Sequence, residues 1–171
     1  IPKNMWYIGT INNDDSTFMV TDKVYDRALP IDINEKAPKF DAPATERVHI
    51  TSEYLTKLFD DAIAARPLSK EILDKIQKMD EYLIAHFRLS FGNRILQQMM
   101  DFVPAFVACG GDELYAVDYM ICHKILRKFE QLNMSYIRNE VDGFIDFLNQ
   151  TFGQESMKEC IKYLLNLKKN I

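Results

Sequence analysis

The sequence has few cysteines and few histidines, and both shortages limit the kinds of site that it can hold. Its three cysteines are an odd number and form no CxxC pair, which argues against a disulfide framework. Its three histidines lie far apart and lack the spacing of metal ligands. We therefore expect no metal site, and we predict reduced, mostly buried thiols in a cytoplasmic protein. The residues concerned are Cys109, Cys122, Cys160, His49, His86 and His123.

The sequence also lacks a long apolar run and an excess of basic residues. No stretch approaches the roughly 18 to 20 apolar residues that span a bilayer, and no signal peptide is recognisable, so we expect no membrane partner. The net charge of −4 argues against a dedicated nucleic-acid-binding module, which usually has a strongly basic face. The 47% of apolar and 27% of charged residues are typical of a soluble globular protein.

The first 34 residues have an α/β pattern. The apolar run MWYIGTI at 5–11 predicts a buried strand, residues 20–28 predict a short helix, and residues 29–33 predict a second strand. Two strands alone cannot make a stable parallel sheet, so either upstream sequence completes the sheet or strands pair between chains. Because the chain opens with Ile1 rather than Met, we expect a piece of a longer polypeptide, with residues 1–34 as the C-terminal portion of an α/β core.

The remainder of the chain predicts a linker and then a helical domain. Residues 35–48 are rich in proline and polar side chains and predict the linker. From His49 onward apolar residues recur at helical spacing, so residues 49–171 predict a helical bundle. The predicted helices span 52–65, 70–87, 91–108, 113–132, 136–151 and 155–168. The predicted fold class is therefore mainly α with a small α/β portion.

Single residues predict the ends and the buried faces of these helices. Thr51 or Ser52 and then Ser69 are the expected N-caps of the first two helices. Pro104 should bend or end the third helix, and Gly153 should split the last stretch. The side chains expected to face inward are Tyr54, Leu55, Leu58, Phe59 and Ile63 in the first helix, and Ile72, Leu73, Ile76, Met79, Leu83 and Phe87 in the second.

Polar residues that follow the first predicted strand are candidates for a binding site. In α/β sheets ligands bind beyond the carboxyl ends of the strands, where Asn12 would lie. Asp15 could cap the next helix, and Arg27 near the end of that helix could form a forked contact with a phosphate. The alternative is that Asn12 and Asp15 are ordinary turn residues and that Arg27 complements the helix dipole.

The pattern as a whole resembles a known family. The stretch GTINNDDSTFMVTDKVYDRA at 9–28 is similar to the second half of an AAA+ NTPase core, in the branch of Mcr-type restriction NTPases, with MoxR and dynein-related ATPases as more distant relatives. In that branch a strand ends Gly-x-(Met/Val)-Asn, an Asp and a Ser or Thr follow, and a helix ends in one or two Arg. Here the matching residues are Gly9, Asn12, Asp15 and Arg27; Ser16 and Asp26 stand where Mcr-type relatives have Arg.

The resemblance implies a role for each matching residue. Asn12 would be the sensor I amide that places the attacking water, and Asp15 would support the nucleotide site. Arg27 would be the arginine finger, acting on nucleotide held by a neighbouring subunit. The stretch LSFGNRILQQMMDFV at 89–103 looks like the helical lid of this branch, so Arg94 would be a sensor II residue that reaches phosphates. The alternative for Arg94 is an exposed residue in the first turn of a helix.

The sequence lacks the Walker A loop, G-x-x-x-x-G-K-[ST], that cradles phosphates. The chain alone should therefore be inactive, and ATP or GTP with Mg²⁺ is expected only in the intact parent protein. The resemblance implies a ring of identical subunits, expected to be a hexamer, with a nuclease subunit and DNA as further partners of a restriction or remodelling motor.

Two other functions are open on the sequence alone. One is a helical protein-interaction module without nucleotide chemistry. The other is a nucleic-acid adaptor with a small basic face, although a solvated surface is the simpler interpretation of its residues. That face would consist of Lys124, Arg127, Lys128, Lys168 and Lys169.

Overall fold

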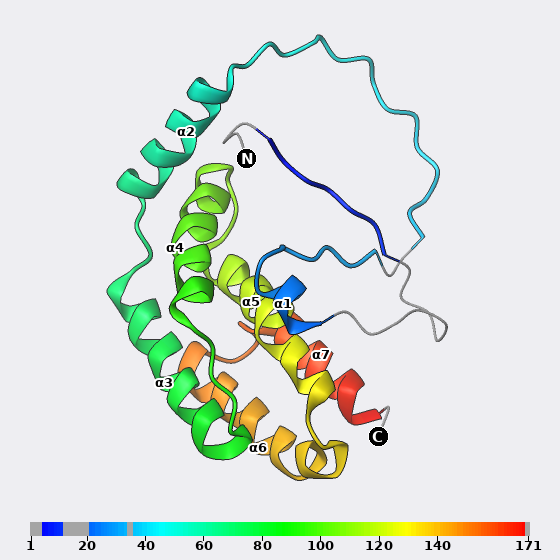
Figure 1. Cartoon of the computed structure of the whole chain (residues 1–171), viewed down its shortest axis with the longest axis vertical. Helices are drawn as coiled ribbons and strands as arrows, with labels where there is room; N and C mark the ends of the chain where they lie inside the picture. The colour runs from blue at the N-terminus through cyan, green and yellow to red at the C-terminus, as the bar shows by residue number, and fades with distance from the viewer. Residues whose placement is uncertain (1–4, 12–20, 34–35, 170–171) are drawn as a thin grey trace.

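The computed structural model describes residues 5–11, 21–33 and 36–169, and within these ranges the chain is mainly helical (Figure 1). Its helices pack into a bundle, while residues 5–11 and 36–51 run along the outside without regular structure. The elements are α1 (Asp22–Tyr25), α2 (Ser52–Ala65), α3 (Lys70–Phe87), α4 (Asn93–Ala108), α5 (Glu113–Lys124), the 3₁₀ segment η1 (Leu126–Gln131), α6 (Met134–Phe152) and α7 (Lys158–Lys169).

Side-chain caps explain where three of the helices begin. The hydroxyl of Thr51 accepts from the backbone N–H of Tyr54 at the start of α2, and the hydroxyl of Ser69 accepts from Ile72 at the start of α3. At the start of α5 the Asp112 carboxylate accepts from the N–H of Tyr115 at 2.8 Å. The predicted caps Thr51 and Ser69 are thus confirmed, and both predicted ranges match the observed helices.

One predicted helix is shorter than expected, and the observed boundaries of α4, α6 and α7 differ from the predicted ones by up to three residues. Pro104 lies inside α4, which ends at Ala108 as predicted, so this proline does not end the helix; its ring is buried. The helix predicted at 113–132 ends at Lys124 and continues as the tighter segment η1. The predicted split at Gly153 is confirmed: this residue has φ of 108° and separates α6 from α7.

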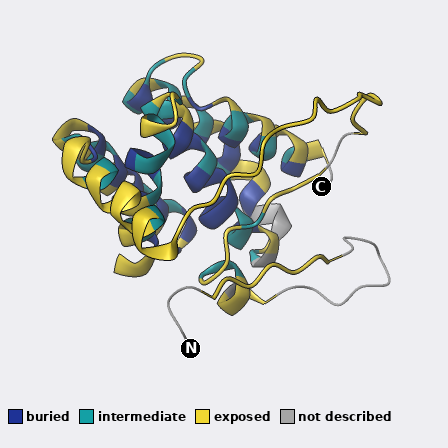
Figure 2. Cartoon of the chain, turned by 90° about the horizontal axis from the view of Figure 1, so that it is seen from above, coloured by how far each residue is buried: buried dark blue, intermediate teal, exposed yellow. Residues whose placement is uncertain are grey.

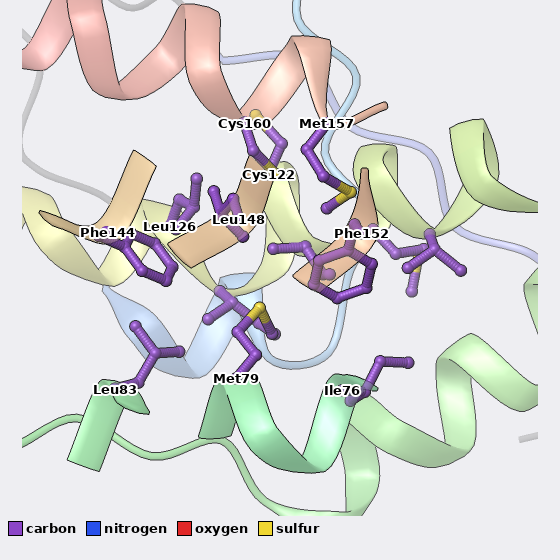
Figure 3. Packing of buried hydrophobic residues seen from close by; sticks show 14 of the residues in the cluster. Ile76, Met79, Leu83, Cys122, Leu126, Phe144, Leu148, Phe152, Met157 and Cys160 are labelled. Atoms are coloured by element: carbon purple, nitrogen blue, oxygen red, sulfur yellow. The ribbon is translucent and has the colours of Figure 1, made fainter. Parts of the chain in front are cut away.

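One apolar core lies between α3, α4, α5, η1, α6 and α7. Figure 3 shows Met79 and Leu83 of α3 facing Phe144 and Leu148 of α6, with Leu126 of η1 beside Leu148. Met79, Leu83 and Phe144 have no exposed surface. The buried residues of α3 are five of the six that were expected to face inward, and the sixth, Leu73, packs against the core from its edge.

A buried carboxylate joins α5 to α7. Asp118 is 1% exposed and accepts the backbone N–H groups of Glu159 at 2.7 Å and Cys160 at 2.9 Å. These groups lie in the first turn of α7, where N–H groups have no partner within the helix. Met157, directly before α7, has no side-chain oxygen and cannot supply this cap. The N-cap of α7 therefore comes from a different helix.

The two predicted strands do not form. Residues 5–11 and 29–33 have no regular secondary structure, and no described segment pairs with either of them. All residues of 5–11 are exposed, Ile8 at 94%. A strand needs a neighbour for its backbone N–H and C=O groups, so apolar sequence alone does not produce a sheet. The small α/β portion is accordingly absent from the described residues.

The predicted burial of α2 is wrong as well. This helix contacts α4, and Leu55 and Ile63 are half-buried there, but Tyr54 is 56% exposed and Phe59 is 42% exposed. Figure 2 shows α2 and the segment before it as largely exposed, in contrast to the buried interior of the bundle. No helix among the described residues is long and apolar enough to cross a membrane.

Candidate functional site

The structure describes two of the four predicted site residues. Asn12 and Asp15 lie outside the described residues. Arg27 lies two residues after α1, is exposed, and forms no hydrogen bond or ion pair with the side chains described here. Arg94 is exposed in the first turn of α4, also without such a partner in the described part of the chain. Both guanidinium groups are therefore accessible to an anion.

Lys124 anchors the backbone on both sides of Arg27. It is the last residue of α5, is only 1% exposed, and donates from Nζ to the carbonyl oxygens of Tyr25 at 2.5 Å and Ala28 at 2.6 Å. Tyr25 is the last residue of α1, where carbonyl groups have no partner within the helix and carry partial negative charge. The ammonium group thus ends α1 as a buried cation.

Asp26 is held by two further elements. Gln98 of α4 donates from Nε2 to the Asp26 carbonyl oxygen at 3.2 Å, and Lys128 of η1 lies 3.7 Å from Asp26 Oδ1. Asp26 Oδ1 and Gln98 Oε1 are buried acceptors without a hydrogen-bond donor among the described residues. The positive charge of Lys128 compensates in part for the first of these oxygens.

Arg127 binds Asp32, which follows residues 25–28 in the chain. Its guanidinium forms an ion pair with Asp32, lies 3.4 Å from Glu130 Oε1, and is centred 5.8 Å from the ring of Tyr25. The Arg127 side chain is only 12% exposed, whereas its partner Asp32 remains 33% exposed. Burial alone would lower the pKa of Arg127, but the carboxylates of Asp32 and Glu130 raise it overall.

Tyr119 and His123 of α5 also contact residues 30 and 32. The Tyr119 hydroxyl donates to the Pro30 carbonyl oxygen at 3.2 Å, and burial raises the pKa of this hydroxyl. His123 Nδ1 donates to the Tyr119 carbonyl at 2.8 Å, since a carbonyl can only accept, and Nε2 lies 3.6 Å from Asp32. We call residues 25–32 the anchored segment. Figure 1 shows its first part, with α1, lying beside α5.

The cationic charge of Lys124 is costly at this position. Burial lowers the pKa of Lys124 because the ammonium loses its hydration, and the carboxylate of Asp26 opposes this shift. The two carbonyl oxygens replace part of the lost hydration. Lys124, Arg127 and Lys128 are therefore not a solvated basic face, as the simpler interpretation of the sequence had it, because each is largely covered by the anchored segment.

The hydrogen bond from Gln98 to Asp26 links the helix that carries Arg94 to the segment that carries Arg27. Arg94 and Gln98 are four residues apart on α4 and so lie on the same face of that helix. Gln98 binds the carbonyl of Asp26, the residue directly before Arg27. Arg94 is thus one helical turn from the point where α4 holds the anchored segment.

A shallow groove lies beside the N-terminus of α4, but its charge does not suit a phosphate. It is lined by residues of α3, of the loop before α4 and of α4 itself, including Asp74, Asp80, Phe91 and Asn93. Asp80 accepts the backbone N–H of Phe91 at 3.3 Å and so fixes that loop. The described residues contain no group of His, Cys, Asp and Glu that could hold a metal ion. The cationic candidates are therefore Arg27 and Arg94 on the outer surface.

Sequence reasoning missed the anchoring role of Lys124. A signal was present: Lys124 lies three residues after Ile121 and seven after Val117, so it continues the buried face of α5. A lysine at such a position is rarely buried without partners. The partners are backbone carbonyls about a hundred residues away, and no sequence pattern marks them.

The chain was also compared with protein-family models, curated proteins and solved structures, and none of these comparisons gave a match.

Proposed function

We propose that this chain is the C-terminal part of an AAA+ NTPase subunit, in which Arg27 is an arginine finger that acts on nucleotide bound by a neighbouring subunit. In this proposal the bundle from α2 to α7 is the helical lid, and residues 1–34 belong to an α/β core completed by other sequence. The nucleotide is ATP or GTP with Mg²⁺, held by a Walker A loop that this sequence does not contain.

The observation that carries the proposal is the contrast between the backbone and the side chain of Arg27. The backbone on both sides of it is fixed by Lys124, while the guanidinium is exposed and has no carboxylate partner among the described residues. A guanidinium in an ion pair would already be neutralised. An unpaired one on a fixed backbone can meet a phosphate with little loss of conformational entropy. Asn12 would supply the sensor amide of the same subunit.

The test is Arg27→Ala in the polypeptide that carries this chain together with the Walker A loop. Because an arginine finger contributes about 10³ to 10⁵ in kcat, hydrolysis should fall by that factor while the Kd of ATP or GTP stays within about threefold. Mixing Arg27→Ala with Asn12→Ala subunits should restore part of the activity, since each defect then lies in a different subunit.

The matched control is Arg138→Ala, which removes an exposed arginine of α6. Normal hydrolysis by Arg27→Ala, or an equal loss in Arg138→Ala, would contradict the finger assignment. A gene that encodes no Walker A and Walker B sequence upstream of Ile1 would contradict the AAA+ proposal as a whole.

A second function, a helical protein-interaction module, is favoured by one specific observation. Tyr54, Leu58 and Phe59 form an exposed apolar stripe on α2. Exposed apolar patches of this kind mark interaction surfaces in many proteins. If this function holds, Leu58→Ser should weaken self-association or partner binding in sedimentation experiments, whereas Arg27→Ala should leave that association unchanged.

A further inference from the structure

We infer that Lys124 is a positioning residue for Arg27, which ties the orientation of the finger to the position of the helical bundle. This inference rests on the proposed function. Its first support is the geometry: the Lys124 ammonium binds the carbonyls of Tyr25 and Ala28, which bracket Arg27 in the chain. The backbone of Arg27 is additionally fixed by its own N–H, which donates to the Val24 carbonyl at 3.0 Å.

The second support is that three different elements hold the segment around Arg27. Lys124 belongs to α5, Gln98 to α4, and Lys128 to η1. Together they contact residues 25, 26 and 28 and leave the side chain of Arg27 without a partner in the described part of the chain. A displacement of these elements would therefore move the backbone that carries the guanidinium.

The third support is the chemical nature of the side chain at position 124. Burying an ammonium is unfavourable, and an apolar side chain of similar length would pack on α5 without that penalty. Only a hydrogen-bond donor at this position can form directional bonds to two backbone carbonyls. The same helix is also joined to α7, because Asp118, less than two turns earlier on α5, caps α7. The link thus connects the finger to the interior of the bundle rather than to a mobile surface.

The experiment uses two readouts on Lys124→Met, which keeps the length of the side chain and removes its donors. The first is hydrogen–deuterium exchange of the 171-residue chain without nucleotide. Amides at 24–29 should exchange about tenfold to a hundredfold faster, since charge-assisted hydrogen bonds that restrain this segment are lost, while α3 and α6 keep their protection. Lys124→Arg should restore part of the protection, and Lys162→Met, an exposed lysine of α7, should change nothing.

The second readout is hydrolysis in the polypeptide with the Walker A loop. Lys124→Met should lower kcat with little change in the Kd of nucleotide, and Lys124→Arg should recover part of kcat. If Lys124→Met unfolds the bundle, Asp32→Asn takes its place, because it removes the carboxylate partner of Arg127 from an exposed segment. The same rise in exchange and fall in kcat are then expected, to a smaller extent.

The outcomes separate the two proposals. Unchanged exchange at 24–29 in both variants overturns the anchoring and with it the inference. A second outcome is that Lys124→Met exchanges faster but keeps its kcat, while Arg27→Ala is inactive. This result overturns the positioning role of Lys124 and leaves the finger assignment of Arg27 intact. Faster exchange in a protein whose Arg27→Ala variant hydrolyses normally refutes the proposed function, and the positioning role falls with it. Faster exchange, lower kcat and rescue by Lys124→Arg support the inference.

Discussion

The region before Leu68 and the region after it differ in how far their apolar side chains are buried. The buried core consists of residues from Leu68 onward, whereas most large exposed apolar side chains come earlier in the chain. Helices α2 and α3 make the contrast clearest. Both have apolar residues at helical spacing and a hydroxyl N-cap, but α3 buries its stripe and α2 buries no residue fully. Amphipathic spacing therefore determines which face can be buried, and a facing surface decides whether it is.

The contrast predicts different costs for the same change in the two regions. Phe144→Ala should lower the free energy of unfolding by about 3 to 5 kcal/mol, because Phe144 has no exposed surface and contacts the rings of Tyr82, Phe87 and Phe129. Phe59→Ala, on the exposed face of α2, should cost less than about 1 kcal/mol. Urea denaturation followed by circular dichroism measures both. A cost of several kcal/mol for Phe59→Ala would show that α2 is packed in solution.

The next largest difference in stability is expected between two separate Asp→Asn substitutions, one at a buried and one at an exposed carboxylate. Asp118→Asn should cost about 1.5 to 3 kcal/mol, since a buried carboxylate that accepts two N–H groups of α7 becomes a neutral amide with one acceptor oxygen. Asp61→Asn in α2 changes an exposed residue and should stay within about 0.5 kcal/mol. Thermal unfolding of both variants tests this, and equal melting temperatures would contradict the trans-helix cap.

The smallest contrast concerns the two hydroxyl caps. Ser69→Ala should lower global stability by about 1 kcal/mol, because α3 forms part of the core and loses the cap bond to Ile72. Thr51→Ala removes the equivalent bond at α2, and its effect should be confined to the exchange of α2 amides, with the global unfolding free energy unchanged. If Thr51→Ala lowers global stability by the same amount, α2 unfolds together with the bundle.

The helical part of the fold could be predicted because its signals are local. Ser69 and Gly153 mark helix ends through their own hydrogen bonds and dihedral angles, and the stripe of α3 follows the helical period. The strands at 5–11 and 29–33 could not be judged in this way. A strand depends on a neighbour that the local sequence does not specify, and neither segment has one among the described residues.

The candidate site was predictable only in part, for the same reason. Arg27 could be selected from its residue type and its place near a helix end, and Arg94 only from the resemblance of residues 89–103 to a helical lid. That Lys124 fixes the backbone beside Arg27 depends on a contact between segments 96 and 99 residues apart, and so on the tertiary fold. Arg127 and Lys128 were expected on a solvated surface, because charge alone does not reveal that a distant segment covers them.

The bonds from Lys124 to the anchored segment also have a consequence for synthesis of the chain. Residues 25 and 28 leave the ribosome long before position 124 is made. At about 5 to 20 residues per second, the delay is on the order of 5 to 20 seconds. During this time the carbonyls of α1 have water in place of the ammonium, and a four-residue helix is not stable by itself. Among the described helices, α1 is therefore translated before the others and is one of the last to fold.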